Sequence, residues 1–180
     1  MKSDGQGYKV GTNSVRRAAQ LKLLYPALEV LHYRGAADTR VHKLDNQIGQ
    51  NLPGGGQTAP ADVLIMAKSG LERVSLADRI AHVYSVDDIL PAATQGIVAV
   101  ECPAQDWRAR EILAKINDAA AECAALAERE VLWVLDGHCN SPMAAHAKIA
   151  GETLNIRAQV FSLDGARVVE ASTRGDAAKP

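Results

Sequence analysis

Short apolar segments alternate with helix-forming segments in the first half of the chain, and this alternation limits the possible folds more than any other feature. The expected strands are residues 8–11, 28–33 and 63–66, and the expected helices are residues 14–24, 37–47 and 67–74. Helical connections favour parallel pairing of the strands with right-handed crossovers. The third strand is apolar throughout, as is typical of a strand covered on both faces. We therefore predict an α/β domain built on a parallel sheet.

Four arginines follow the first two expected strands. Arg16 and Arg17 come after the first strand, and Arg34 and Arg40 come after the second. The carboxyl ends of parallel strands meet at one edge of a sheet, and ligands of α/β proteins bind there. Guanidinium groups bind carboxylates and phosphates through two parallel hydrogen bonds. The four positions predict an anion-binding rim on one edge of the sheet.

The charge distribution agrees with such a rim. Residues 1–50 hold eight Lys or Arg against four Asp or Glu, whereas residues 51–180 hold twelve against seventeen. Thr12, Asn13 and Ser14 add hydrogen-bonding groups, and Ser14 can cap the helix whose first N–H groups attract anions. A single arginine is more often a solvated surface residue than a ligand-binding one. Four arginines near strand ends favour binding of a polyanion.

The middle of the chain holds a Gly/Pro-rich loop and the end of the first unit. Residues 51–60 lack the Lys-Ser or Lys-Thr pair of a phosphate-binding P-loop, so we expect a surface loop that is too flexible to pack. Residues 81–86 and 97–102 are expected strands, and residues 106–116 are an expected helix.

The remaining residues predict a smaller α+β unit. Residues 118–135 are rich in alanine and are expected to form one long helix. Three β-forming segments follow at residues 144–149, 154–161 and 168–172, with Gly-Glu and Asp-Gly pairs as hairpin turns between them. This tail predicts a helix on a three-stranded antiparallel sheet.

The three cysteines have two possible interpretations. Cys102, Cys123 and Cys139 are an odd number without a C-x-x-C pair, which argues against a disulfide framework and a structural zinc site. Cys102 and Cys123 are expected to be inert small side chains. Cys139 lies in a turn between Gly137 and Pro142, where a thiol can be presented to a ligand. The residues alone leave open whether Cys139 is inert or functional, and the histidines show no metal-ligand spacing.

The sequence also allows predictions about the location of the protein and its partners. No apolar run approaches the roughly 20 residues of a membrane span, and the first residues lack the apolar centre of a signal peptide. We expect a soluble, cytoplasmic protein without a membrane partner. No recognised nucleic-acid-binding motif accompanies the basic segment, so nucleic acid is not an expected partner.

Several motifs together resemble the porphobilinogen deaminase family, whose members are also called hydroxymethylbilane synthases. They include Gly-Thr-Asn-Ser-Val-Arg-Arg at residues 11–17, Arg-Gly at 34–35, Thr-Arg at 39–40 and Gln-Gly at 95–96. Downstream, Ala-Glu-Arg at residues 127–129, Cys139 and Asp-Gly at 164–165 follow in the family's order. The resemblance covers nearly the whole chain.

The resemblance implies a fold and a division into domains. The fold is an α/β, parallel-sheet domain like the type-2 periplasmic binding proteins, followed by a small α+β domain. The expected limits are residues 1–90 for the domain with the arginine-lined rim and 117–180 for a cofactor-attachment domain. Residues 91–116 are expected to be a remnant segment of an N-terminal domain that is otherwise missing.

The resemblance also implies a reaction. Family members condense four porphobilinogen molecules to hydroxymethylbilane with release of ammonia, in tetrapyrrole and heme biosynthesis, on a dipyrromethane primer held by a thioether. Porphobilinogen and the growing polypyrrole would be the partners, and no metal is implied. Cys139 matches the attachment cysteine. The residues expected to bind the primer are Thr12, Asn13, Ser14, Arg16 and Arg17, and those expected to bind primer or substrate are Arg34, Arg40 and Gln95.

One family element has no counterpart in this sequence. The catalytic aspartate of the family lies in a Ser-Met-Lys-Asp segment, which does not occur here, and the family's final helix is also not matched. We therefore expect a shortened chain that is inactive alone and whose N-terminal domain is supplied by an upstream portion. The alternative is a non-catalytic module that binds polypyrroles or other carboxylates.

Overall fold

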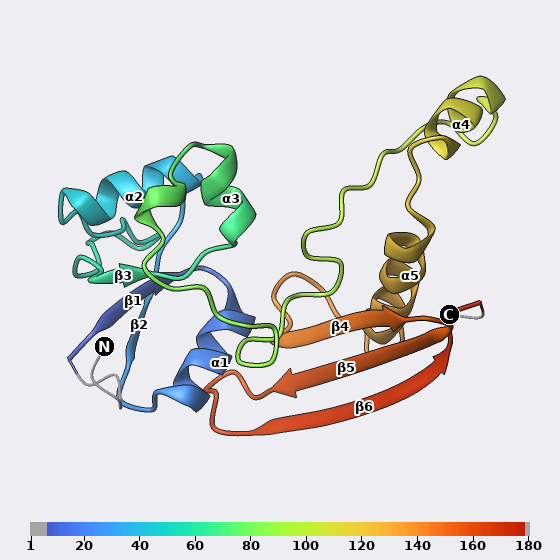
Figure 1. Cartoon of the computed structure of the whole chain (residues 1–180). Coiled ribbons are helices and arrows are strands. Elements are labelled where there is room, and N and C mark those ends of the chain that lie inside the picture. The colour runs from blue at the N-terminus through green and yellow to red at the C-terminus, as the bar shows by residue number, and fades with distance from the viewer. Residues whose placement is uncertain (1–6, 179–180) are drawn as a thin grey trace. The chain divides into compact units, whose positions relative to one another are not determined.

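Three parallel strands form the first sheet, in the order β2-β1-β3 (Figure 1). The computed structural model describes residues 7–178. The strands of this sheet are β1 (Lys9–Thr12), β2 (Glu29–His32) and β3 (Val63–Leu64). Thr12 pairs with His32 in the parallel register. The loops that follow β1 and β2 therefore leave the same edge of the sheet, as the sequence predicted.

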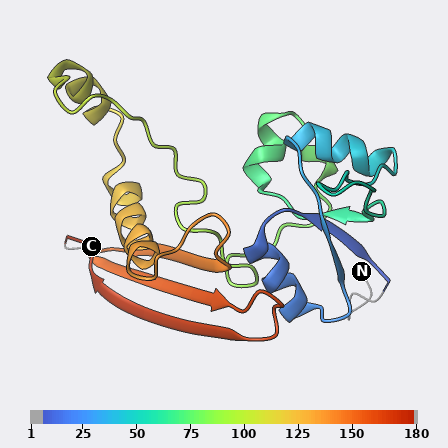
Figure 2. The ribbon, with the colours of Figure 1, turned by 180° about the vertical axis from the view of Figure 1, so that it is seen from behind.

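Helices α1 (Val15–Leu24) and α2 (Ala37–Asp45) connect the strands and cover opposite faces of the sheet (Figures 1 and 2). Val10 on β1 packs with Leu21 of α1. Leu31 on β2 belongs to a second cluster, which Leu44 of α2 joins. Successive strand residues point to opposite faces, so a sheet with both faces covered needs apolar residues at consecutive positions. The expected α/β unit with parallel strands is confirmed.

Gly11 allows the side chains of Leu64 and Tyr33 to pack closely against β1. A Cβ at this position would lie 2.7 Å from Leu64 Cδ2 and 2.9 Å from Tyr33 Cγ, which is too close for carbon atoms. Tyr33 itself is completely buried, and its hydroxyl donates to the carbonyl of Ile48. The glycine of the Gly-Thr-Asn-Ser motif thus serves the packing directly beneath the rim.

The Gly/Pro-rich loop is better ordered at its base than the sequence predicted. The N–H of Thr58 donates to the carbonyl of Gln50 at 2.9 Å, and the N–H of Gln50 donates to Thr58 Oγ1 at 3.0 Å. Asn51 and Gln57 form an antiparallel bridge beyond this pair. The prediction of a loop too flexible to pack was wrong for its base, because the polar residues around the glycines hydrogen-bond across it.

The segments after β3 depart from the expected pattern. The short helix α3 (Lys68–Arg73) and the 3-10 helix η1 (Ala77–Arg79) follow β3, which is shorter than expected. The expected strands at residues 81–86 and 97–102 are wrong, because neither segment pairs with a strand within residues 7–178. Val98 is 72% exposed and Val100 is 60% exposed. A β-forming sequence becomes a strand only where a neighbouring strand completes its hydrogen bonds.

The rest of the chain contains two helices and a second sheet. Helices α4 (Trp107–Ala114) and α5 (Ala119–Val134) precede the strands β4 (Met143–Ala150), β5 (Thr153–Phe161) and β6 (Val168–Asp176). The strands follow one another in the order β4-β5-β6 and run antiparallel. Cys123 of α5 packs with Ala147 and Leu154 of the sheet. The expected helix on a three-stranded antiparallel sheet is confirmed.

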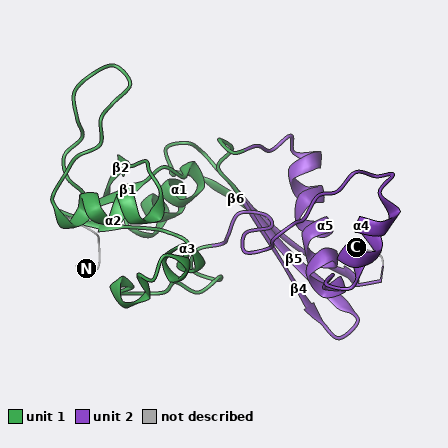
Figure 3. Cartoon of the chain, turned by 90° about the horizontal axis from the view of Figure 1, so that it is seen from above, with its two compact units in different colours: residues 1–89, 139–143, 160–169 green, residues 90–138, 144–159, 170–180 purple. Residues whose placement is uncertain are grey.

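Two compact units divide the chain in an interleaved way (Figure 3). The first contains the chain up to Ile89 together with Cys139–Met143 and Val160–Val169. The second contains Leu90–His138, Ala144–Gln159 and the chain from Glu170 onward. The domain limits expected from the sequence, at residues 90 and 116, stay a prediction. Within residues 7–178, no helix has the length and apolar character needed to cross a membrane.

Glu128 of α5 is a buried carboxylate in the second unit. It is 3% exposed and accepts hydrogen bonds from the backbone N–H groups of Thr94 and Ala147. His146 Nδ1 lies 3.3 Å from its Oε1. A buried carboxylate is stabilised when several donors surround it. Glu128 therefore ties the turn around Thr94 to strand β4.

Replacing Glu128 should destabilise the second unit strongly. In Glu128→Ala, two N–H groups lose their acceptor, so the free energy of unfolding should fall by roughly 2–5 kcal/mol, measured by urea denaturation. Glu130→Ala, on the exposed face of the same helix, is the matched control and should change it by less than about 0.5 kcal/mol. Equal effects of the two substitutions would contradict the assignment.

Candidate functional site: an arginine rim

The rim begins at the N-terminus of α1, directly after β1. Ser14 caps this helix, because its Oγ accepts the N–H of Arg17 at 3.3 Å. Thr12 Oγ1 in turn accepts the N–H of Ser14 at 3.2 Å, and Thr12 is 3% exposed. Both hydroxyl oxygens are thus engaged in building the turn. Their structural contribution is to hold the first turn of α1 in a fixed position at the sheet edge.

Arg16 and Arg17 stand in the first turn of α1 and are held in an unfavourable environment. Burial and the neighbouring charge of Arg17 lower the pKa of Arg16 to about 10. Burial and the charge of Arg40 lower the pKa of Arg17. Arg16, Arg17 and Arg40 therefore interact electrostatically as one group of like charges. The structure brings these three predicted residues together, from two different helices.

Arg40 of α2 has an unsatisfied polar atom. Its Nε is buried and has no hydrogen-bond partner within residues 7–178. A buried donor without an acceptor destabilises a protein by about 1–3 kcal/mol, more when the group is charged. Together with the neighbouring guanidinium of Arg17, this atom forms a local environment that an acceptor with negative charge would stabilise.

Arg34 joins the rim from the end of β2. Its Nε donates to Asn13 Oδ1 at 3.3 Å and to His32 Nε2 at 2.8 Å. Its terminal amino groups have no hydrogen-bond partner in the described part of the chain, and the residue is exposed. Asn13, from the loop after β1, thus orients an arginine from the loop after β2. The end of this guanidinium remains available for a ligand.

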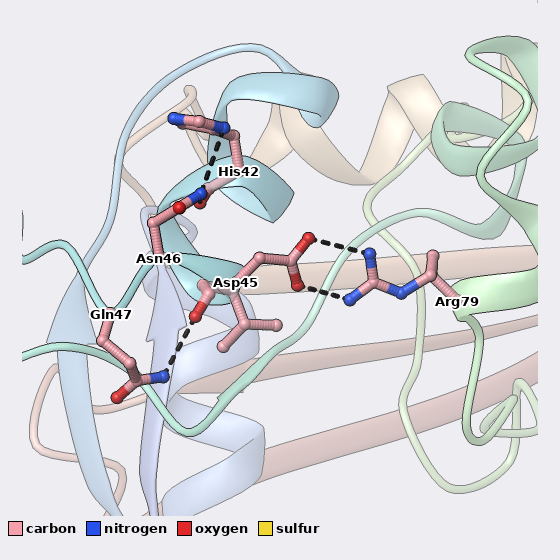
Figure 4. Close-up of polar contacts among 6 residues, drawn as sticks. His42, Asp45, Asn46, Gln47 and Arg79 are labelled. Carbon is pink, nitrogen blue, oxygen red and sulfur yellow. Dashed lines mark hydrogen bonds and ion pairs between the residues drawn. The ribbon is translucent and has the colours of Figure 1, made fainter.

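The C-terminal end of α2 is fixed by charges that lie outside the rim (Figure 4). Arg79 of η1 forms a two-pronged ion pair with Asp45, with Nη1 2.9 Å from Oδ2. The hydrogen bond from Arg79 lowers the pKa of Asp45. Asn46 caps the same turn by donating to the carbonyl of His42 at 2.8 Å. The carboxylate of Asp45, at the C-terminal end of the helix that carries Arg40, is thereby neutralised locally.

Cys139 and Gln95 are placed differently. Cys139 is exposed and belongs to the same compact unit as the rim, through the segment Cys139–Met143. Gln95 is exposed in the turn that follows Ala92, in the second unit. Its expected role stays a prediction, as does that of Cys139.

Two residues near the rim were not singled out as site residues from the sequence. Lys43 Nζ donates to the carbonyl of Arg34 at 3.1 Å and to Gln50 Oε1 at 2.9 Å. Gln50 Oε1 also accepts the N–H of Arg34 at 2.9 Å. Lys43 lies three residues after Arg40 on the same helix, which was a usable signal. Gln50 gave no signal, because it lies beside a loop that glycine and proline content marked as unstructured.

The fold and this rim together define an α/β domain with a basic edge. Comparison with known proteins makes the assignment specific. Residues 1–111 match the family model described as "Porphobilinogen deaminase, dipyromethane cofactor binding domain", and residues 122–180 match "Porphobilinogen deaminase, C-terminal domain". The chain belongs to the porphobilinogen deaminase family. The model whose description names the cofactor covers the part that carries the arginines.

Curated relatives agree with the family models. The chain is 38% identical to porphobilinogen deaminase of Corynebacterium glutamicum over 178 residues, which is 97% of this chain and 55% of the relative. It is 39% identical to that of Acidithiobacillus ferrooxidans, over 94% of this chain and 52% of the relative. The enzyme of Bordetella parapertussis is 41% identical, over 94% and 50%. The chain thus spans about half the length of these relatives.

The unfavourable packing of the rim predicts opposite effects of Arg40→Met on stability and on anion binding. Removing a charge that repels Arg17 and has a buried unpartnered Nε should raise the Tm of the unliganded chain by a few degrees. The same substitution should reduce the rise in Tm that citrate causes relative to NaCl at equal ionic strength.

Differential scanning calorimetry of both proteins, with and without citrate, measures the two effects. Arg129→Met is the matched control, because Arg129 is an exposed arginine on α5, and it should change neither quantity. A lower Tm for Arg40→Met combined with an undiminished response to citrate would contradict the interpretation of the rim.

Proposed function

We propose that this chain holds a cysteine-linked dipyrromethane and its growing polypyrrole, within a porphobilinogen deaminase that condenses four porphobilinogen molecules to hydroxymethylbilane. The observation that carries the proposal is the group of like charges at the strand edge. Burial and a neighbouring guanidinium lower the pKa of both Arg16 and Arg17, and Arg40 has a buried donor without an acceptor in the described residues. Each pyrrole of the primer and product carries an acetate and a propionate, so the ligand is a polycarboxylate that matches this need.

The contacts of the individual rim residues are compatible with binding the carboxylates of a dipyrromethane. Arg16 and Arg17 would bind primer carboxylates at the first turn of α1, where the positive end of the helix dipole also favours anions. Thr12 and Ser14 would act by holding that turn, since their hydroxyl oxygens already accept backbone hydrogen bonds. Asn13 would act through the orientation of Arg34. Arg34 and Arg40, with Gln95, would bind primer or incoming substrate.

Cys139 would provide the covalent anchor. It is exposed and lies in the same compact unit as the rim, which supports its assignment over Cys123, whose thiol is buried and donates to the carbonyl of Ala177. Attachment requires the thiolate to form an S–C bond to the methylene carbon from which the amine departs as ammonia. When bound, the dipyrromethane supplies the pyrrole α-carbon at which the chain grows by C–C bond formation and loss of the α-proton.

The proton transfers need an acid that this sequence does not supply in recognisable form. Asp45 is paired with Arg79, and Asp38 accepts hydrogen bonds from its neighbour Thr39. No Ser-Met-Lys-Asp segment occurs in the sequence. We therefore assign the catalytic carboxylate to the half of the relatives' length that the chain does not span, and we expect no turnover by these 180 residues alone.

The domain organisation is part of the same proposal. The first unit would correspond to a domain like the type-2 periplasmic binding proteins, within residues 1–90, and residues 117–180 to the cofactor-attachment domain. The exposed, unpaired segment around Val98 and Val100 supports assigning residues 91–116 to a domain completed by other parts of the family's polypeptide. We propose a cytoplasmic location, without membrane or nucleic-acid partners. The second candidate function, a non-catalytic polycarboxylate-binding module, is favoured only by the missing acidic segment.

Intact-mass spectrometry tests the covalent part of the proposal. Chain purified from a host that makes tetrapyrroles should exceed its sequence mass of 19.1 kDa by the mass of two linked pyrroles. The increment should be absent from Cys139→Ser, because the S–C bond cannot form. Cys102→Ser and Cys123→Ser are matched controls and should retain it. A mass equal to that of the sequence for all four proteins would favour the non-catalytic module.

A further inference from the structure

Gln50 lies where the loop that precedes β3 meets the rim, and its side-chain amide is shared between two rim elements. Gln50 Oε1 accepts the backbone N–H of Arg34 and the ammonium group of Lys43, each at 2.9 Å. Lys43 Nζ also donates to the carbonyl of Arg34 at 3.1 Å. The N–H and the carbonyl of Arg34 are therefore both held by this pair of side chains.

The base of the loop fixes Gln50 in turn. Its N–H and carbonyl are both bonded to Thr58, at 3.0 and 2.9 Å. Gly49 makes this possible, since a Cβ there would lie 2.0 Å from the carbonyl oxygen of Thr58. The hydroxyl of Tyr33 holds the carbonyl of Ile48 just before it. The loop base is thus attached to the same strand end that carries Arg34.

Arg34 needs such support because it lies outside the regular helices and strands, so no element of secondary structure holds its backbone. It stands between β2 and α2, next to Gly35 at φ +128°, a conformation that L side chains rarely adopt. Its guanidinium is fixed at one end by Asn13 and His32, while its terminal amino groups point to no protein acceptor in the described residues. The direction of those groups depends on where the Arg34 backbone is held.

We propose that Gln50 is a positioning residue for carboxylate recognition, which holds the Arg34 backbone so that its guanidinium end faces a ligand carboxylate. The proposal rests on the proposed function of the rim. Gln50 contributes through a neutral acceptor, which satisfies Lys43 without adding negative charge to an anion-binding edge. The Gly/Pro-rich loop is thereby a functional part of the rim and not only a surface connection.

A double-mutant cycle on the 180-residue chain, with citrate as the probe, tests this assignment. Arg34→Met should weaken citrate binding on the order of tenfold in isothermal titration calorimetry, since one charge-assisted contact is lost. Gln50→Ala should weaken it on the order of threefold in the wild-type background. It should cause no further loss in the Arg34→Met background, because its effect passes through Arg34.

Hydrogen exchange of the Arg34 amide provides a second readout that does not depend on the probe. The amide should exchange faster in Gln50→Ala and recover its protection in Gln50→Glu, which restores an acceptor. Gln57→Ala is the matched control, because Gln57 bonds to Asn51 farther out in the loop and should affect neither measurement.

The outcomes separate this inference from the function on which it rests. Equal citrate affinity of the wild type and Arg34→Met would overturn the proposed function, and the inference with it. A weaker Arg34→Met together with an unchanged Gln50→Ala, in both affinity and exchange, would overturn the role of Gln50 alone. An equal loss from Gln50→Ala in both backgrounds would show a general structural effect and would also overturn it.

Discussion

Repulsion among guanidinium groups at the carboxyl end of a parallel sheet is the constraint on which the account of this protein depends. Arg16 and Arg17 are adjacent in the first turn of α1, and Arg40 reaches the same region from α2. Concentrating positive charge in a partly buried place lowers stability unless something negative neutralises it. The fold maintains this arrangement through contacts away from the charges. Ser14 caps α1, Asp45 pairs with Arg79 at the far end of α2, and Gly11 permits close packing beneath the rim.

The arrangement has a functional interpretation, because the carboxylates of the proposed ligand and the guanidinium groups of the rim would neutralise each other's charge. A pyrrole oligomer with two carboxylates on every ring repels itself in the same way as the rim does. Under the proposed function, binding would neutralise both partners and give an acceptor to the Nε of Arg40. The chain belongs to the porphobilinogen deaminase family, as two family models show, and the ligand proposed on that basis has this chemistry. A covalent anchor at Cys139 would let the carboxylates shift along the arginines as the chain grows.

Much of this could be predicted from the sequence where the controlling interactions are local. The cap at Ser14, the helices α1, α2 and α5, and the hairpin turns before β5 and β6 are encoded within a few residues of each other, and the structure agrees. The approach of Arg40 to Arg17 was also predictable, because parallel strands place their following loops on one edge. The segment containing Val98 and Val100 was mispredicted because strand formation depends on a partner strand, which propensity cannot supply. Gln50 was missed because its contacts with Arg34, Lys43 and Thr58 depend on how the loop folds back, which loop composition does not reveal.

The most direct test of the central claim is to observe the rim guanidinium groups while a polycarboxylate binds. Arginine labelled with ¹⁵N at Nε, assigned by single substitutions, can be followed by NMR during titration with citrate. The account predicts saturable shifts at Arg16, Arg17, Arg34 and Arg40, with no shift at the exposed Arg129 of α5. Shifts of similar size at Arg129 and at the rim, or none at the rim, would contradict it.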